Sequence, residues 1–105
     1  MACTHLQHQD LTLKARNYCS PYGEIDLIMR ERDTLVFVEV RFRKTPDFGT
    51  PAETVGERKQ TKLRATAVHY LQHTPRASKK ASRFDIVAIS EDGDDSLSWY
   101  RNALE

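Results

Sequence analysis

Apolar side chains recur at alternate positions along three stretches in the first half of the chain. These stretches are Leu11 to Tyr18, Ile25 to Arg30 and Leu35 to Phe42, and each places apolar residues at alternate positions. A period of two is typical of a β-strand that buries one face. The segment Ser20 to Gly23 has the composition of a turn, and Arg32-Asp33 predicts a two-residue hairpin between the last two strands.

The pattern becomes helical after a long irregular segment. Lys44 to Gly56 contains two prolines and two glycines without a consistent period, which predicts a surface loop. Thr54 and Glu57 then match a capping box, and apolar residues follow at helical spacing. We therefore expect a helix over Glu57 to His73, ended by Pro75.

The remaining elements complete an α/β pattern. Arg76 to Ser82 is basic and polar and predicts a mobile connection, followed by a strand over Phe84 to Ile89. Asp92-Gly93 predicts a turn before a last strand, Leu97 to Arg101. The helical crossover is long enough to make the third and fourth strands parallel, so we expect a mixed sheet.

Composition places the chain in a broad class. Its 105 residues, 39% hydrophobic and 30% charged, suit one small domain over residues 1–105. No apolar run approaches membrane-spanning length, and Met1 to Asp10 lacks the features of a secretory signal, so we expect a cytoplasmic protein without a membrane partner. Cys3 and Cys19 have no CxxC spacing and are expected to be reduced thiols.

Charge is unevenly distributed along the chain. Residues 41–80 hold ten Lys or Arg against three acids, and the rest holds six against twelve. A basic block suits contact with a phosphate backbone, although a solvated charged helix explains it equally well. The candidate nucleic-acid contacts are Arg43, Lys44, Arg58, Lys59 and Lys62.

Acidic residues recur in the second and third strands. With Arg32-Asp33 at the centre of the hairpin, Asp26 lies opposite Glu39 and Glu24 lies opposite Arg41, all on one face. Their apolar neighbours, such as Ile25 and Leu27, then fall on the other face, toward the core.

Opposed carboxylates repel each other, and a divalent cation offsets that repulsion. Asp26 and Glu39 are therefore candidate ligands of Mg²⁺ or Mn²⁺, with Arg41 beside them to stabilise charge on a phosphate. The alternative is the solvated face of an amphipathic sheet, with Glu24 and Arg41 as an ordinary ion pair.

Other catalytic chemistry has little support in the sequence. His69 and His73 have the spacing of a metal pair, and so do His5 and His8, but neither pair has a third ligand or an HExxH pattern. No nucleophile elbow, phosphate-binding glycine loop or dinucleotide fingerprint is present.

Four short motifs occur in order and together resemble the YraN family of predicted endonucleases, designated UPF0102, over about Leu6 to Tyr100. The motifs are Gly23-Glu24-Ile25-Asp26-Leu27-Ile28, Leu35-Val36-Phe37-Val38-Glu39-Val40-Arg41, Lys59-Gln60 and Arg83-Phe84-Asp85-Ile86-Val87. That family is similar to Holliday-junction resolvases of the PD-(D/E)xK nuclease superfamily. The resemblance implies a restriction-endonuclease-like α/β fold, with a mixed β-sheet of about five strands and flanking helices. It also implies metal-dependent cleavage of DNA, including branched DNA, and by analogy a homodimer.

Carried over to this sequence, the resemblance gives roles to particular residues. Asp26 fills the motif's Asp position, Glu39 its second acid and Arg41 its Lys position. Glu24 and Gln60 match positions that border the site.

Two departures from the family pattern bear on catalysis. Arg41 stands where lysine is typical, so it keeps electrostatic stabilisation but cannot activate water as a lysine can. The helix glutamate of resolvase-like members is also missing, because Thr4 to Gln9 resembles only the last turns of that helix; Asp10 or Glu24 would have to substitute, or the start is truncated. The competing hypothesis is therefore a nucleic-acid-binding or scaffold protein that keeps the fold and cuts nothing.

Overall fold

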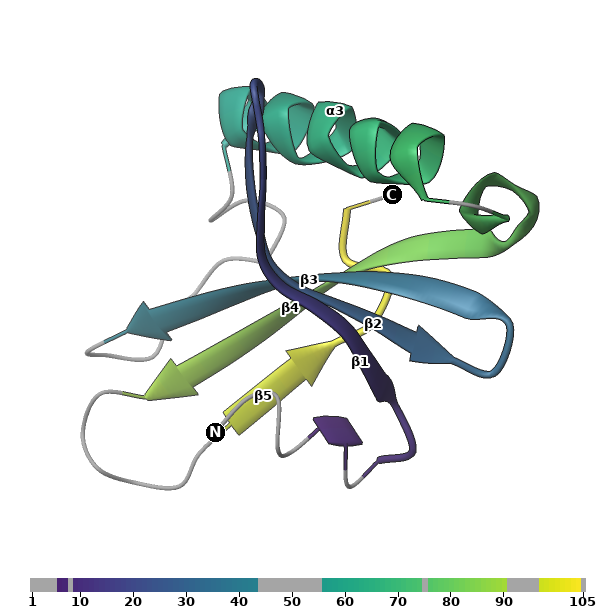
Figure 1. The fold of residues 1–105 in the computed structure, drawn as a ribbon. Coiled ribbons are helices and arrows are strands. Elements are labelled where there is room, and N and C mark those ends of the chain that lie inside the picture. The colour runs from purple at the N-terminus through teal and green to yellow at the C-terminus, as the bar shows by residue number, and fades with distance from the viewer. Residues whose placement is uncertain (1–5, 8, 44–55, 75, 91–96, 105) are drawn as a thin grey trace.

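The computed structural model describes residues 6–7, 9–43, 56–74, 76–90 and 97–104, apart from the side chains of residues 42, 43, 78, 90 and 97. These residues form a five-stranded sheet with the strand order β1-β2-β3-β4-β5 (Figure 1). The elements are β1 (Thr12–Ser20), β2 (Gly23–Glu31), β3 (Thr34–Arg43), α3 (Glu57–His73), η1 (Ala77–Lys79), β4 (Ala81–Ser90) and β5 (Leu97–Tyr100).

The sheet is mixed, as the sequence predicted. β3 and β4 are parallel, whereas the β1–β2, β2–β3 and β4–β5 pairs are antiparallel. Helix α3 provides the crossover between the two parallel strands. The result is an α/β fold consistent with a restriction-endonuclease-like domain. None of the helices formed by the described residues has the length and apolar character needed to span a bilayer.

Helix α3 has the bounds that the apolar spacing predicted, but its start differs. Gly56 is the N-cap, no side chain caps the helix, and the Gly56 carbonyl accepts the Gln60 N–H at 3.0 Å. The predicted capping box is therefore wrong as the start of the helix, and Thr54 itself lies outside the described residues. Residues 44–55 and the predicted Asp92-Gly93 turn also lie outside them. The predicted connection after the helix contains the 3-10 turn η1.

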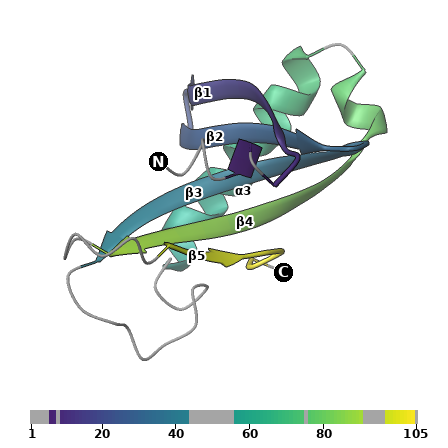
Figure 2. The same ribbon diagram turned by 90° about the horizontal axis from the view of Figure 1, so that it is seen from below.

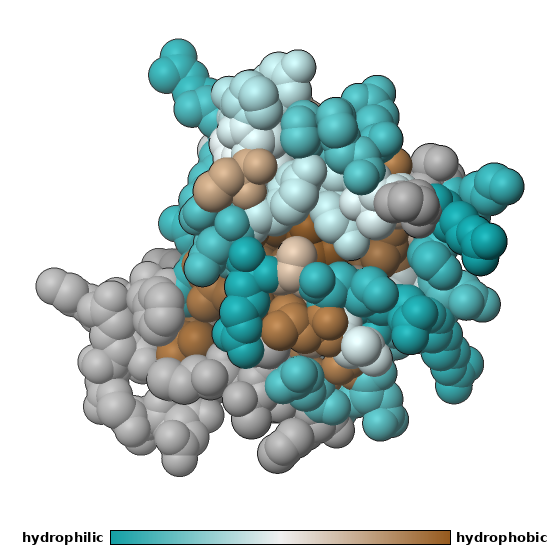
Figure 3. Space-filling view, in the orientation of Figure 1, coloured by the Kyte–Doolittle hydropathy of each residue, from teal (hydrophilic) through white to brown (hydrophobic). Residues whose placement is uncertain are grey.

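Both faces of the sheet are buried, which the sequence did not predict. One cluster lies under α3 and includes Ile28, Phe37, Leu63, Tyr70 and Ile86. The other lies on the opposite face and includes Leu6, Leu11, Met29, Val36, Val38 and Val87. Figure 2 shows α3 on one side of the strands and the short N-terminal helical turn on the other. In the space-filling view, apolar side chains are visible at the level of the strands, between hydrophilic outer regions (Figure 3).

The β2–β3 hairpin has the predicted register over part of its length. Its pairs run from Glu31 with Thr34 to Leu27 with Val38, and Arg32 in the turn has φ 55°. Beyond Leu27, β2 leaves β3 and rises with β1 beside α3 (Figure 1).

This divergence corrects one sequence prediction. Ile25 was expected on the face opposite Asp26, but it packs in the cluster under α3 together with Ile28. The alternation rule holds for a strand that stays in one sheet, and here β2 turns out of the plane of β3 toward the helix.

The turn end of the β1–β2 hairpin contacts the middle of α3. The hydroxyl groups of Ser20 and Thr66 are 3.0 Å apart. A Cβ built at Gly23 would lie 3.4 Å from the Lys62 Cβ, at van der Waals distance, so the start of β2 lies directly against the helix. The first turns of α3 therefore face the place where β2 and β3 diverge.

Candidate functional site

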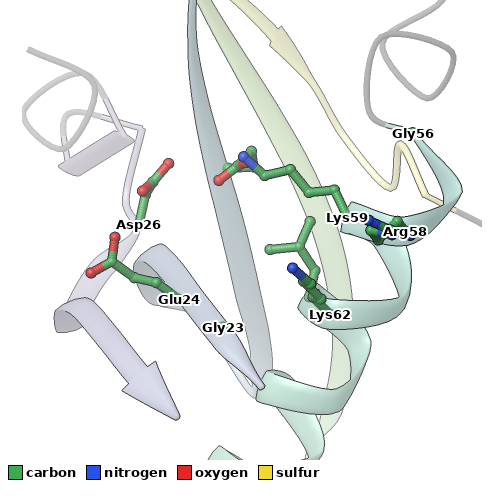
Figure 4. Close-up of a pocket in the computed structure, with 9 residues that line it drawn as sticks. Gly23, Glu24, Asp26, Gly56, Arg58, Lys59 and Lys62 are labelled. Carbon is green, nitrogen blue, oxygen red and sulfur yellow. The ribbon is translucent and has the colours of Figure 1, made fainter. Parts of the chain in front are cut away.

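A pocket of about 530 Å³ lies between α3 and the diverging strands β2 and β3. One wall carries acidic side chains from the strands, and the other carries basic side chains from the helix (Figure 4). The lining residues are Gly23, Glu24, Asp26, Glu39, Gly56, Arg58, Lys59, Lys62 and Leu63.

Asp26 is fixed by the backbone of the neighbouring strand. Its Oδ2 accepts the N–H of Val40 at 2.9 Å, at the point where the β2–β3 ladder has ended. The predicted backbone pairs of Asp26 with Glu39 and of Glu24 with Arg41 are absent from the ladder that the described residues form. Asp26 and Glu39 nevertheless line the same pocket, and the Asp26 carboxyl is close enough to affect the pKa of Glu39.

Glu39 is buried, with only 4% of its surface exposed. Burial and the nearby Asp26 carboxyl raise its pKa from 4.5 to about 7, although Lys59 opposes this shift. The Lys59 ammonium forms an ion pair with Glu39 Oε2. In Figure 4, Lys59 reaches from the first turn of α3 across the pocket, and Lys62 points into the same space.

Glu24, predicted to border the site, also lines the pocket and is exposed. The thiol of Cys19 lies 3.2 Å from Glu24 Oε2, and this hydrogen bond raises the pKa of the thiol. Asp10 is exposed and is not among the lining residues, so of the two proposed substitutes for the helix glutamate only Glu24 is near the acid pair.

The other predicted site residues lie elsewhere or outside the described region. Arg41 is partly buried on β3 and is not among the residues that line the pocket, and Gln60 is not among them either. The side chain of Arg43 and all of Lys44 lie outside the described residues. The role predicted for Arg41 therefore stays a prediction.

Comparison with known proteins gives a consistent family relationship. The model of the uncharacterised protein family UPF0102 matches residues 1–89. The chain belongs to the UPF0102 family. A UPF0102 protein of Nitrosococcus oceani is 48% identical over 105 residues, which cover 99% of this chain and 85% of that protein. Relatives from Nitrosomonas europaea and Pseudomonas fluorescens are 46% and 43% identical over 104 residues, with 99% of this chain and 86% of each relative covered.

The donor set of this UPF0102 protein fits a hard divalent cation. Asp26 and Glu39 offer two converging carboxyl groups in an open pocket, and Mg²⁺ is commonly held by one or two carboxylates plus water and substrate phosphate. The described part of the chain contains no group of three or more His, Cys, Asp or Glu side chains that could hold a metal. The His69–His73 pair therefore has no third ligand among the described residues.

Lys59 is the site residue whose partner the sequence did not reveal. It was predicted as one of several phosphate contacts, whereas the UPF0102 structure pairs it with Glu39. The signal available was the Lys59-Gln60 motif at the start of the helix. That motif marks a position but does not say which strand residue faces it.

Asp85, in the fourth UPF0102 motif, belongs to a separate network on the other face of the sheet. It is 1% exposed and accepts hydrogen bonds from Arg83, from Trp99 Nε1 at 2.8 Å and from the Asn102 N–H at 2.9 Å. Arg83 also pairs with Glu31 at 2.9 Å. This acid therefore ties β4 to the end of β5 and does not line the pocket.

Proposed function

We propose that this protein is a metal-dependent endonuclease that hydrolyses phosphodiester bonds in DNA, including branched DNA. The observation that carries the proposal is the presence of the Asp26 and Glu39 carboxyl groups in one pocket with a cationic opposite wall. Adjacent carboxylates suit a divalent cation, and basic side chains suit the phosphate groups of a nucleic acid.

Asp26 and Glu39 would hold Mg²⁺ or Mn²⁺. When bound, the cation would act as a Lewis acid on a phosphate oxygen and would lower the pKa of a coordinated water. Asp26 keeps its orientation through the Val40 N–H, and its carboxylate has further lone pairs for a ligand. Glu39 would exchange the Lys59 ammonium for the cation, so Lys59 already marks a position that favours positive charge.

The helix side of the pocket would bind the substrate. Lys62 and Arg58 are exposed and line the pocket, where they would hold phosphate groups next to the acid pair. Lys59, once released from Glu39, would be near enough to stabilise negative charge that develops on the reacting phosphate. Arg41 is proposed to stabilise the same charge; its guanidinium stays protonated, so it is not the general base.

The second candidate function is a nucleic-acid-binding protein that does not cleave. It is favoured by the absence, among the described residues, of any group of three potential metal-ligating side chains. The Glu39–Lys59 ion pair points the same way, because an acid that is already neutralised needs no metal.

A cleavage assay separates the two candidates. Purified protein is incubated with a labelled four-way DNA junction and with linear duplex, in Mn²⁺, in Mg²⁺ and in EDTA. The nuclease proposal expects metal-dependent cleavage that Asp26→Asn and Glu39→Gln each reduce at least a hundredfold. DNA binding without cleavage in any metal contradicts it and supports the second candidate.

The matched control is Asp33→Asn. Asp33 is an exposed acid in the turn of the same hairpin, so its replacement removes one negative charge without touching the pocket. This variant should cleave like the wild type. Thermal unfolding of each variant, followed by circular dichroism, shows whether lost cleavage reflects lost folding.

A further inference from the structure

Tyr22 is an exposed aromatic side chain next in sequence to two residues that line the pocket. Among the described residues it is one of two large hydrophobic side chains with high exposure, at 57%, and Val68 on α3 is the other, at 49%. Tyr22 lies in the turn between β1 and β2, directly before Gly23 and Glu24, which both line the pocket.

The turn holds Tyr22 in a defined place. The Tyr22 N–H donates to Ser20 Oγ at 3.0 Å, and Ser20 Oγ is itself 3.0 Å from the Thr66 hydroxyl on α3. The Tyr22 ring meets the ring of His69 edge-on, with centroids 6.5 Å apart and an angle of 70° between the planes. The Tyr22 side chain is therefore largely exposed while its backbone is held by the turn.

His69 supports this arrangement from the helix. Its Nδ1 lies 2.6 Å from the Tyr18 hydroxyl, and Tyr18 packs edge-on against the buried Tyr70. The His73 ring stacks on the His69 ring with centroids 4.1 Å apart. We call the continuous aromatic surface formed by Tyr22, His69 and His73 the aromatic ledge. It contacts the core through the Tyr18–His69 hydrogen bond.

The ledge and the pocket share one face of α3. Lys59, Lys62, Thr66, His69 and His73 follow one another at spacings of three and four residues, which places them in one stripe along the helix. Lys59 and Lys62, at the start of this stripe, line the pocket. The turn of the β1–β2 hairpin contacts the middle of the stripe at Thr66, and the two histidines lie after it, toward the end of the helix. A polyanion bound at the basic end would extend past Tyr22.

From this juxtaposition we infer that the aromatic ledge stacks against an unpaired nucleobase of the nucleic acid whose phosphate occupies the pocket. The inference rests on the proposed function and adds where the neighbouring nucleotide binds. Exposed aromatic rings beside cationic side chains are the means by which proteins hold single-stranded nucleic acid. Glu24 lies two residue steps along the chain from Tyr22, roughly 7 Å if extended, the length of about two stacked nucleotides.

The test measures binding in EDTA, where no metal-dependent cleavage occurs. Fluorescence anisotropy follows a labelled duplex with a single-stranded tail, and a series of the same DNA with one abasic residue at each tail position. Tyr22→Ala should weaken binding to the intact DNA by roughly five- to a hundredfold. Tyr22→Phe, which keeps the ring, should stay within about twofold of the wild type.

The abasic series identifies stacking. The wild type should lose affinity at one or two tail positions, and Tyr22→Ala should be insensitive to the same positions because the contact is already gone. Val68→Ala, the matched control at the other exposed hydrophobic residue, should bind like the wild type.

Four outcomes would overturn the inference. Equal weakening of Tyr22→Ala on intact and abasic DNA would mean that no base is stacked. An effect of Tyr22→Ala on self-association in sedimentation, with DNA affinity unchanged, would assign the ledge to a second copy of the chain. A wild type that cleaves DNA while all Tyr22 variants bind equally would reject the ledge alone, whereas a wild type that binds no DNA would reject the proposed function and the ledge together.

Discussion

Two buried carboxylates, Glu39 on β3 and Asp85 on β4, lie on opposite faces of the sheet in opposite surroundings. Asp85 accepts hydrogen bonds from a guanidinium, an indole and a backbone amide. Glu39 lies beside a second acid, Asp26, and meets the ammonium of Lys59. Asp85 is 1% exposed and Glu39 is 4% exposed, so burial alone does not distinguish the two acids.

The difference shows what each acid is suited to do. A carboxylate whose oxygens are occupied by protein donors stabilises the fold and has little capacity for a ligand. A carboxylate placed next to another carboxylate is unfavourable in the folded protein unless a cation joins them. The four predictions below test this contrast, beginning with the largest expected effect.

Asp85→Ala should lower the free energy of unfolding by about 3–5 kcal/mol, because it removes the buried acceptor that Arg83, the Trp99 indole and the Asn102 N–H share. Urea unfolding followed by circular dichroism measures the loss. Asp85→Asn is the matched variant and should lose less, since its amide oxygen can still accept from Trp99 or Asn102. A loss below about 1 kcal/mol for Asp85→Ala would contradict the structural role.

Glu39→Gln should raise stability at pH 8, by a few kcal/mol at most. The pKa of Glu39 is about 7 in the folded protein and 4.5 in the unfolded chain. The folded state therefore binds the proton more tightly, and the stability of the wild type falls as the pH rises from 4.5 to 7. The advantage of the variant should be greatest above pH 7 and should vanish near pH 4.

Urea unfolding at several pH values checks this sign. Glu31→Gln is the control, because the hydrogen bond with Arg83 lowers the pKa of Glu31. Its wild-type contribution is present above pH 4.5 and is lost as the pH falls, so this variant should be less stable than the wild type at pH 8. A Glu39→Gln variant that is also less stable at pH 8 would mean that the acid pair carries no penalty.

Binding of a divalent cation should remove the unfavourable interaction between Asp26 and Glu39 without any mutation. Mn²⁺ at ten times its dissociation constant stabilises a protein by about 1.4 kcal/mol, which would raise the Tm of a domain of this size by several degrees. Asp26→Asn and Glu39→Gln should abolish the shift, and Asp85→Asn should retain it. NaCl at matched ionic strength is the control for screening, and an equal shift in all variants would place the metal elsewhere.

Lys59→Gln should have the smallest effect on stability, below about 1 kcal/mol, because the Lys59 side chain is 53% exposed. The variant should bind Mn²⁺ a few times more tightly, since the ammonium no longer competes for Glu39. Lys62→Gln is the matched control: Lys62 lines the same pocket without an ion pair to Glu39 among the described contacts. Weaker Mn²⁺ binding by Lys59→Gln would mean that the lysine supports the metal position.

The sequence by itself determined the local elements and much of their pairing. The period of two located the strands, helical spacing located α3, and the turn at Arg32-Asp33 set the register that brings Leu27 opposite Val38. It also indicated that Asp26 and Glu39 would come close together, and the motifs indicated the UPF0102 family. These features follow from residues that are near one another in the chain or that repeat with a fixed period.

Only the tertiary structure decided what covers each face of the sheet. A period of two shows that Asp26 and Glu39 share a face but not that α3 packs over it, so the burial of Glu39 and its partner Lys59 could not be foreseen. The same holds for the departure of β2 from β3 and for the separate role of Asp85. The physical reason is that these contacts join side chains far apart in sequence, and their choice depends on how whole elements pack, which no local pattern encodes.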